Sequence, residues 1–466
     1  MSILVNRPSF GELHFADCDL GDRRRTRRLV DLANRIHQHP EGSLPYKLRD
    51  PAAYRALCRL LNQPTVTHAA VLQPHRQRTF ERLRQQTGPV LIVHDFTELD
   101  YSGHETLRGL LGQIGNGGGQ GYECHNSLAV EPDSGQVLGL VNQILHRRRH
   151  APPGEGIAAK RDCPQRESRV WLQAVQAIGP APAGACWVDV ADRGADTFEF
   201  LEHECRHGRH FLVRSRYNRA LLSQTAAGAA ALHDQLRAQE PVLGWTVRVA
   251  AQAGQPARQA RVVACYQAVT LRAPHTGRRG QYARRPLPLW AIRVWEVEAP
   301  PEVSEPLEWL LLTDLPIRDA AELRQRVAWY ERRPLIEEFH KAQKTGLAIE
   351  ALQFTTEGAL QPAIALLSVV AVGLLNLREA ARDRERAEQP ATTQVEAAYV
   401  EALSVWRYGA VRALTVREFT LALGRLGGHL GRKADGLPGW QTLWRGWNQL
   451  HALVTYEKSR AKCGKS

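Results

Sequence analysis

The pattern of apolar and polar positions divides the chain into three stretches. Residues 1 to about 75 show helical spacing of apolar side chains, as in the segment from Leu29 to Ile36. Short apolar runs typical of buried strands follow, and the last part of the chain is again helical and rich in aromatic residues. We therefore predict a helical domain (1–75), a central α/β domain (76–378) and a helical C-terminal domain (379–466).

The central stretch contains the predicted strands. The run from Val90 to Val93 predicts a buried strand, and the segments 125–130 and 136–145 predict the next two. Further strands are expected just before Asp192 and over residues 210–216.

A second group of strand-like segments lies between about residues 218 and 305. They begin near Trp245, Ala260 and Leu289. The loops between them are basic and include Arg278, Arg279, Arg284 and Arg285.

Composition indicates a polyanionic partner. The 466 residues include 61 lysines and arginines against 48 aspartates and glutamates, which gives a formal net charge of +13. Such an excess is typical of proteins that bind nucleic acids, although acidic proteins and membrane surfaces attract basic chains as well. The glycine-rich segment 112–121 is followed by no Gly-Lys-Ser/Thr sequence, which argues against a nucleotide-binding P-loop.

Two further features bear on the compartment. The most apolar run, Pro362 to Leu375, is shorter than the roughly 20 residues that a membrane span needs, so it predicts a buried helix and no membrane partner. The eight cysteines include no Cys-x2-Cys pair, and no secretory leader opens the sequence. We expect reduced thiols in a cytoplasmic protein.

The main candidate for chemistry is the stretch from Tyr330 to Lys344. If it is one helix, Tyr330, Arg333, Glu337 and Lys344 lie within about 60° of arc. The carboxylate could then hold a divalent metal while the cations and the phenol bind phosphate oxygens. An amphipathic helix with a solvated charged stripe has the same spacing. Because proline is costly in the middle of a helix but tolerated in its first turn, the helix could instead begin near Pro334.

This stretch also carries a resemblance to a known family. Its pattern is Tyr330-x2-Arg333-x3-Glu337-x6-Lys344, preceded by Trp309-Leu-Leu-Leu-Thr313. The pattern resembles the signature of the bacterial cut-and-paste DDE transposases of insertion sequences, and matching segments run from about Leu20 to Trp447. The resemblance implies a ribonuclease-H-like catalytic core with an inserted β-sheet at about 218–305, flanked by helical N- and C-terminal domains.

The resemblance assigns three catalytic carboxylates. Asp95, at the expected end of the first buried strand, matches the first, and Asp192, in an Asp-Arg-x-Ala-Asp motif, matches the second. Glu337 is the third. Glu98 and Asp100 are rivals of the first, and Asp100 is expected to face away or lie in the turn. Asp189 is the main rival of the second, and Asp196 is expected to start a helix.

Three such carboxylates can hold two Mg²⁺ ions, or Mn²⁺, about 3.5–4 Å apart. The family nicks DNA at the ends of its transposon, forms and opens a hairpin, and transfers the strand to a target. Transposon ends and target DNA are therefore the implied double-stranded partners. A homodimer in the synaptic complex, joined through the C-terminal domains, is implied as well.

The remaining site residues concern DNA contacts. By resemblance Tyr330, Arg333, Lys344 and Arg214 bind phosphates, and Trp309 stacks on a flipped thymine, although a tryptophan in an apolar strand is more often a core residue. Asp22 is a candidate helix N-cap ahead of an arginine-rich segment that resembles the end-binding domain of the family. Its expected DNA contacts are Arg24, Arg25 and Arg28, and a solvated charged face is the alternative.

Two other classes of function remain open. The first is a DNA-binding regulator that occupies transposon ends without cutting, against which the complete carboxylate triad argues. The second is a stand-alone ribonuclease-H-like nuclease, against which the basic N-terminal domain argues.

Overall fold

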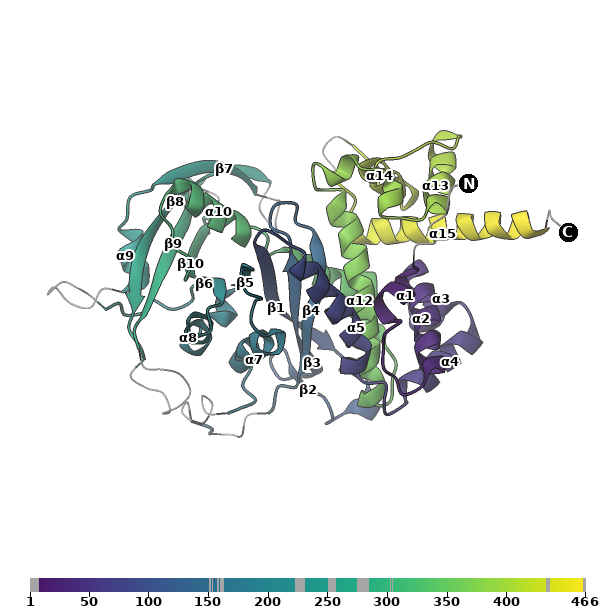
Figure 1. Ribbon diagram of the computed structural model, residues 1–466, viewed down its shortest axis with the longest axis horizontal. Coiled ribbons are helices and arrows are strands. Elements are labelled where there is room, and N and C mark those ends of the chain that lie inside the picture. The colour runs from purple at the N-terminus through teal and green to yellow at the C-terminus, as the bar shows by residue number, and fades with distance from the viewer. Residues whose placement is uncertain are drawn as a thin grey trace.

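The computed structural model describes residues 8–150, 152, 154–156, 159, 163–222, 231–249, 257–274, 285–301, 303, 305–432 and 436–463. A large twisted sheet occupies one half of the molecule (Figure 1), and the N-terminal and C-terminal helices lie beyond one side of it. The long helix α12 (Glu357–Ala380) runs between these two parts beside α5 (His68–Arg84). The predicted mixed α/β architecture with helical flanks agrees with this arrangement.

The N-terminal stretch is helical, as its apolar spacing predicts. Its helices are α1 (Phe10–Phe15), α2 (Arg23–Gln38), α3 (Leu44–Leu48), α4 (Pro51–Leu61) and α5. The Asp22 carboxylate accepts the backbone N–H of Arg24 at 2.8 Å, so the predicted N-cap of α2 is present. The expected domain boundary at residue 75 falls inside α5, which packs along β4 and α12.

In the part of the chain that the structure describes, ten strands form one sheet in the order β2-β3-β1-β5-β6-β10-β9-β8-β7, with β4 also paired to β3. They are β1 (Val90–Asp100), β2 (Gly112–Ile114), β3 (Gly119–Val130), β4 (Val137–His146), β5 (Trp187–Ala191), β6 (His210–Arg214), β7 (Leu243–Val249), β8 (Arg258–Leu271), β9 (Leu287–Val297) and β10 (Glu308–Thr313). The pairs β1–β5 and β5–β6 are parallel, and the other pairs are antiparallel.

The strands expected between residues 218 and 305 are β7, β8 and β9. They extend the central sheet, because β9 pairs with β10 and β10 pairs with β6. Of the four arginines expected in their loops, Arg278, Arg279 and Arg284 lie outside the described residues, whereas Arg285 lies just before β9.

Helices cover both faces of the sheet. One face carries α7 (Ser168–Ile178) and α8 (Phe198–Arg206), whose apolar side chains pack on β5, β6 and β10. The opposite face carries α10 (Ala320–Tyr330), α11 (Leu335–Lys341) and α12. The short helix α9 (Leu232–Arg237) packs near β8 and β9. Parallel strands β1 and β5 are thus buried on both faces, which explains their uninterrupted apolar runs.

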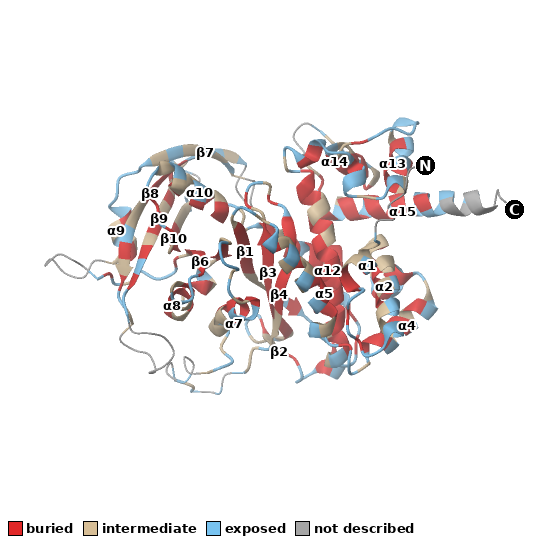
Figure 2. Ribbon diagram, in the orientation of Figure 1, coloured by how far each residue is buried: buried red, intermediate tan, exposed pale blue. Residues whose placement is uncertain are grey.

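Helix α12 is the central helix of the core, and Figure 2 shows it buried along most of its length. The 24-residue helix is long and apolar enough to cross a membrane, judged by length and composition alone. However, 83% of its most apolar 18-residue window is buried inside the protein. That burial is typical of a core helix, as the run from Pro362 to Leu375 predicts.

The C-terminal part consists of α13 (Ala397–Tyr408), α14 (Val416–Leu426) and α15 (Trp440–Cys463). Its aromatic residues form a core of their own, in which Trp447 stacks on Tyr399. Helix α15 also contacts the N-terminal helical region, where the ring centroids of His39 and His451 are 3.7 Å apart.

Short helical turns complete the chain. They are the 3-10 turns η1 (Glu105–Leu107), η2 (Arg193–Ala195), η4 (Ile349–Ala351), η5 (Arg386–Glu388) and η6 (Ala391–Thr393), and the π-helical turn η3 (Ala342–Gly346).

Candidate active site

Two parallel strands place Asp95 beside Asp192. Val93 of β1 pairs with Val190 of β5, and each aspartate comes two residues after its valine. The expectation that the first strand ends at Asp95 is wrong, because β1 remains paired with antiparallel β3 as far as Asp100. Asp95 lies instead just beyond the point where the pairing of β1 with β5 ends, which leaves room for a side chain from another element.

That side chain comes from the turn between α10 and α11. The single helix considered for residues 330–344 is wrong, since α10 ends at Tyr330 and α11 begins at Leu335. The alternative, a helix that begins near Pro334, agrees with the structure. Proline has no N–H to donate to the preceding turn, so Pro334 becomes the N-cap of α11, and Arg333 lies in the connection.

Arg333 joins the three predicted carboxylates. Its guanidinium is 2.6 Å from Asp95 Oδ2 and 3.7 Å from Asp192 Oδ2, and it forms an ion pair with Glu337. The three acidic residues, far apart in sequence, therefore converge on one cation. Asp95 is the most enclosed, with its side chain 13% exposed, against 38% for Asp192 and 47% for Glu337.

The charges at this site are unbalanced. Burial raises the pKa of Asp95 to about 6; Arg333 opposes this shift, and the negative charges of Asp192 and Glu337 add to it. Burial would lower the pKa of Arg333, but the three carboxylates raise it above its usual value. One guanidinium thus faces up to three negative charges, and the site favours additional positive charge.

The donor set suits a hard divalent cation, because carboxylate oxygens are the ligands that Mg²⁺ prefers. Within the described part of the chain, no group of three or more acidic, histidine or cysteine side chains is arranged to hold a metal ion. The guanidinium of Arg333 lies among the carboxylates instead. The residues fit a metal chemically, and its binding would require the guanidinium to move aside.

The other residues of the signature lie around this cluster. Tyr330 is buried, and its ring packs edge-on against Trp309 with the ring centroids 5.2 Å apart. Burial raises the pKa of Tyr330 to about 12, although nearby Arg333 and Arg214 lower it.

Lys344 makes a different contact from the one expected. Its ammonium is 3.1 Å from Glu350, whose carboxylate also accepts the backbone N–H of Asp100 at 2.9 Å. The helix widens into the π-helical turn η3 after Lys341, so the α-helical spacing that would align Lys344 with Glu337 is interrupted.

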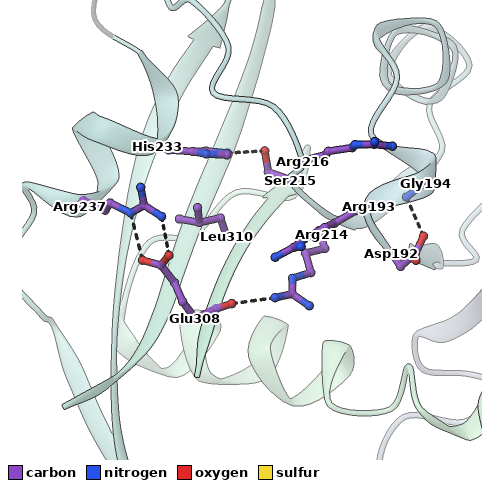
Figure 3. A pocket seen from close by; sticks show the side chains of 10 residues that line it. All are labelled: Asp192, Arg193, Gly194, Arg214, Ser215, Arg216, His233, Arg237, Glu308 and Leu310. Carbon is purple, nitrogen blue, oxygen red and sulfur yellow. Dashed lines mark hydrogen bonds and ion pairs between the residues drawn. The ribbon is translucent and has the colours of Figure 1, made fainter. Parts of the chain in front are cut away.

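A basic pocket of about 560 Å³ opens on the other side of Asp192. Its lining residues are Asp192, Arg193, Gly194, Arg214, Ser215, Arg216, His233, Arg237, Glu308 and Leu310. Figure 3 shows Arg193 and Arg214 next to each other between Asp192 and Glu308. The Glu308 carboxylate is held by Arg237 at 2.6 Å and Arg293 at 2.9 Å, so it does not neutralise the other arginines.

Sequence reasoning found Arg214 but missed Arg193 and Arg216. Arg214 donates to the backbone oxygen of Glu308 at 2.9 Å. A signal was available for the other two, since Arg193 directly follows Asp192 and Arg216 lies two residues beyond Arg214.

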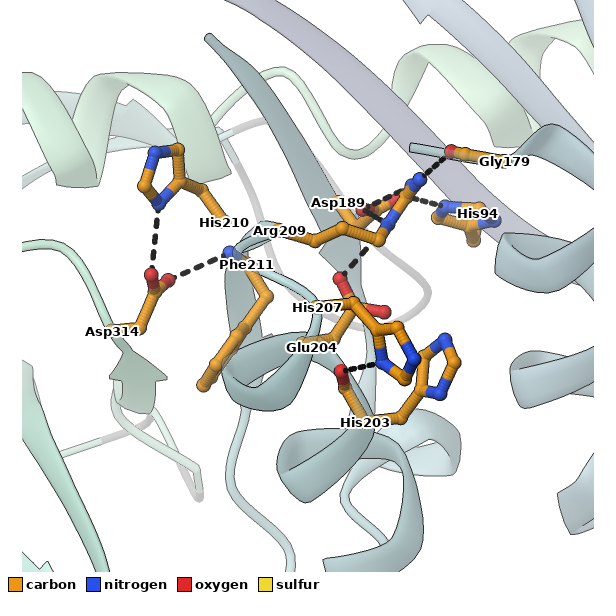
Figure 4. Close-up of polar contacts among 10 residues, drawn as sticks. All are labelled: His94, Gly179, Asp189, His203, Glu204, His207, Arg209, His210, Phe211 and Asp314. Carbon is orange, nitrogen blue, oxygen red and sulfur yellow. Dashed lines mark hydrogen bonds and ion pairs between the residues drawn. The ribbon is translucent and has the colours of Figure 1, made fainter. Parts of the chain in front are cut away.

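The rival Asp189 lies on the opposite face of the sheet. Figure 4 shows it between His94 and Arg209. Its carboxylate oxygens are 2.7 Å from His94 Nε2 and 2.6 Å from the Arg209 guanidinium. Burial would raise the pKa of Asp189, but Arg209 and His94 hold it below its usual value. This fully buried carboxylate joins β1, β5 and the segment before β6, which is a structural role.

The other rivals also have local partners. The expectation that Asp196 starts a helix is wrong, because Thr197 is the N-cap of α8. Asp196 is buried and accepts the backbone N–H groups of Arg216 at 2.6 Å and Tyr217 at 3.1 Å, which fixes the loop after β6.

Near Asp95, Glu98 accepts the backbone N–H of Gly115 at 2.7 Å. As expected, Asp100 turns toward the loop, where it accepts from the Ser102 hydroxyl at 2.6 Å.

The three arginines expected to contact end DNA differ in their surroundings. Arg24 and Arg28 are exposed on α2, four residues apart and therefore on one side of the helix. Arg25 donates to Thr65 Oγ1 and to Gln63 Oε1, both at 3.0 Å, and so ties α2 to the segment after α4. The structure thus leaves Arg24 and Arg28 open to a ligand and engages Arg25 internally.

Comparison with known protein families identifies one part of the chain. Residues 8–66 match the model of the transposase DNA-binding family. The match covers α1 to α4, the region that carries Arg24 and Arg28. It supports a transposase role and DNA as the partner.

Proposed function

We propose that this chain, with its transposase DNA-binding domain, is a metal-dependent transposase of the cut-and-paste DDE type found in insertion sequences. The observation that carries the proposal is the convergence of Asp95, Asp192 and Glu337 on Arg333. The mixed sheet supports a ribonuclease-H-like core, since antiparallel β3 and β4 lie on one side of β1 and parallel β5 and β6 on the other.

In this proposal the three carboxylates hold Mg²⁺ or Mn²⁺. Two bound ions would activate the attacking water or 3′-hydroxyl and stabilise the leaving oxygen. The Asp95 side chain is 13% exposed and accepts the backbone N–H of Phe96 at 2.9 Å, so its direction is set before DNA arrives.

Arg333, once released from the carboxylates, can bind a DNA phosphate through two parallel N–H donors, which lysine cannot do. Arg214 and the basic pocket next to Asp192 would hold neighbouring phosphates of the same substrate.

The helical domain would bring the transposon end to this site. Arg24 and Arg28, exposed on α2, would bind phosphates of the end sequence. Hairpin formation at the end, strand transfer to a target and a synaptic homodimer joined through the C-terminal helices belong to the same proposal.

One observation favours the second candidate, a regulator that occupies transposon ends without cutting. Arg333 lies among the three carboxylates, and in the described residues they are not arranged around a metal site. If the Arg333 guanidinium always stayed among the carboxylates, the protein would bind transposon ends through α2 without cutting them.

The deciding experiment is cleavage of a labelled duplex carrying the element's own end, with Mg²⁺. We expect nicks and hairpins from the wild type, and binding without cutting from Asp192→Ala and Glu337→Ala. Glu98→Ala is the matched control, since this acidic side chain lies on the same strand as Asp95 but contacts Gly115. Binding without cutting by the wild type, with either Mg²⁺ or Mn²⁺, would establish the regulator instead.

A further inference from the structure

Four polar side chains form a closed ring in the core behind Asp95. Gln143 Nε2 donates to Asn126 Oδ1 at 2.7 Å and to Ser368 Oγ at 2.9 Å. Gln343 Nε2 donates to the same Ser368 oxygen at 2.8 Å, and Asn126 Nδ2 lies 3.5 Å from Gln343 Oε1. All four are buried, on β3, β4, η3 and α12.

One side of this ring touches the elements of the carboxylate site. Asn126 of β3 is the direct cross-strand partner of Asp95, so the two side chains leave the sheet on the same face. Gln343 lies in the π-helical turn that continues α11, between Glu337 and Lys344. The ring therefore fixes β3 against the segment that supplies Glu337.

The other side of the ring leads to the DNA-binding domain. His68 Nε2 is 2.9 Å from Gln143 Oε1, and His68 is the first residue of α5, two positions after the matched segment 8–66. Thr65, three residues earlier, accepts the guanidinium of Arg25 from α2. Hydrogen bonds, together with the short backbone stretch from Thr65 to His68, thus join α2 to β3, the strand that faces Asp95.

Burial makes this chain of contacts stiff. Leaving a buried amide without its hydrogen-bond partner costs about 1–3 kcal/mol. A shift of one side chain in the ring therefore forces its hydrogen-bonded neighbour to shift with it. Its members come from segments up to 242 residues apart in sequence, from Asn126 to Ser368.

We propose that Asn126, Gln143, Ser368 and Gln343 are positioning residues that couple occupation of the end-binding helix α2 to the arrangement of Asp95 and Glu337. A shift of α2 when it binds DNA would be transmitted to the ring through Arg25, Thr65 and His68. The ring then shifts the turn η3 against β3. This inference rests on the proposed function, and it makes the metal affinity of the carboxylates depend on DNA bound at a distant domain.

The experiment measures thermodynamic coupling in the full chain. Mn²⁺ affinity is determined by electron paramagnetic resonance with and without a duplex of the terminal repeat that stops short of the cleavage position. Such a duplex occupies α2 but cannot place a phosphate beside Arg333. We expect the duplex to raise the Mn²⁺ affinity of the wild type about fivefold or more, the lower range for allosteric coupling.

Two variants break the ring in different ways. Ser368→Ala removes one oxygen that accepts from both glutamines, and Gln343→Met replaces the amide by a group of similar length. For each we expect folded protein, a duplex affinity within about twofold of wild type, and a coupling factor near one. Gln361→Met is the control, because this amide lies on the same helix as Ser368 but contacts Tyr122 and Glu357.

A wild-type coupling factor of one, or full coupling in Ser368→Ala, would overturn the proposal. A ring with a purely structural role would lower the melting temperature of the variants and leave their coupling factor unchanged. The measurement needs no cleavage, so the two proposals can fail separately. A chain that couples duplex to Mn²⁺ but never cuts would refute the cutting step of the proposed function, and the end binding and metal binding on which this inference rests would stand.

Discussion

The charge balance around Arg333 decides what the candidate site can bind. Three carboxylates share one guanidinium, and burial together with the neighbouring negative charges raises the pKa of Asp95 to about 6. A cation that enters this site must therefore replace Arg333 or share the carboxylates with it. Under the proposed function a DNA phosphate would also compete for Arg333, because a guanidinium binds phosphate as well as carboxylate. Metal and DNA should consequently help each other to bind.

The first prediction concerns this competition. We expect Arg333→Gln to raise the Mn²⁺ affinity of the DNA-free protein by about tenfold or more, because a charge-assisted contact worth about 1.5–3 kcal/mol no longer opposes the metal. The same variant should cleave DNA poorly, since it lacks the guanidinium that would bind the phosphate. Titration calorimetry with Mn²⁺ measures the first effect.

Arg332→Gln is the matched control for that titration. Arg332 is the preceding residue, but its guanidinium donates to the backbone oxygen of Pro132 at 2.7 Å, outside the carboxylate cluster. Equal Mn²⁺ affinity in wild type and Arg333→Gln would show that the guanidinium does not compete with the metal.

Among the elements, α2 shows how a short sequence signal sets up the arginine surface that we propose binds DNA. Asp22 caps the helix, and the arginines that follow are distributed by the helical repeat. Arg24 and Arg28 face outward, whereas Arg25 points to the segment that leads into α5. The cap fixes where the helix starts and therefore which arginines face solvent.

The second prediction tests that cap. Asp22→Ala should lower the free energy of unfolding by about 1 kcal/mol, because the N–H of Arg24 loses its acceptor. End-DNA affinity should fall as well, since the first turn that carries Arg24 frays. Urea unfolding and gel shift measure the two effects.

Asp31→Ala serves as the comparison for the cap. It removes the same charge from the same helix, but Asp31 only pairs with exposed Arg35, a contact worth about 0.3–0.5 kcal/mol. An equal loss of stability in the two variants would mean that charge, and not capping, matters at residue 22.

Across the whole molecule, the sequence predicted those features that depend on residues close together in sequence. The apolar runs before Asp95 and Asp192 gave β1 and β5, and Asp189 could have been placed on the far face, because side chains alternate along a strand. The position of Arg333 could not be derived, since it depends on how α10, Pro334 and α11 pack against two strands far away in sequence. The same holds for β7 to β9, whose extension of the central sheet is set by pairing with β10.

The turn η3 is where the parts of the molecule meet. Gln343 binds the core ring, Lys344 binds Glu350, and Gly346 lies against Trp444 of α15. The C-terminal helix α15 thus packs on the segment that continues α11. A shift of α15 against Gly346 would therefore displace the backbone that leads back to Glu337 in the candidate site.

The last prediction concerns this contact. A Cβ at Gly346 would lie 2.6 Å from Trp444 Nε1 and 2.7 Å from Trp444 Cζ2, closer than side-chain carbons approach. Because Trp444 is buried, its ring cannot swing away freely. We expect Gly346→Ala to lower the free energy of unfolding by about 1–3 kcal/mol, measured by urea unfolding.

Gly358→Ala is the opposite case on a neighbouring element. Gly358 lies in the first turn of α12, and a Cβ there meets nothing within 4 Å. Alanine restricts the unfolded chain without a clash, so this variant should gain about 0.4–1 kcal/mol. If both alanines were tolerated equally, α15 would have to be held loosely against η3, and the C-terminal helices could then move without disturbing Glu337.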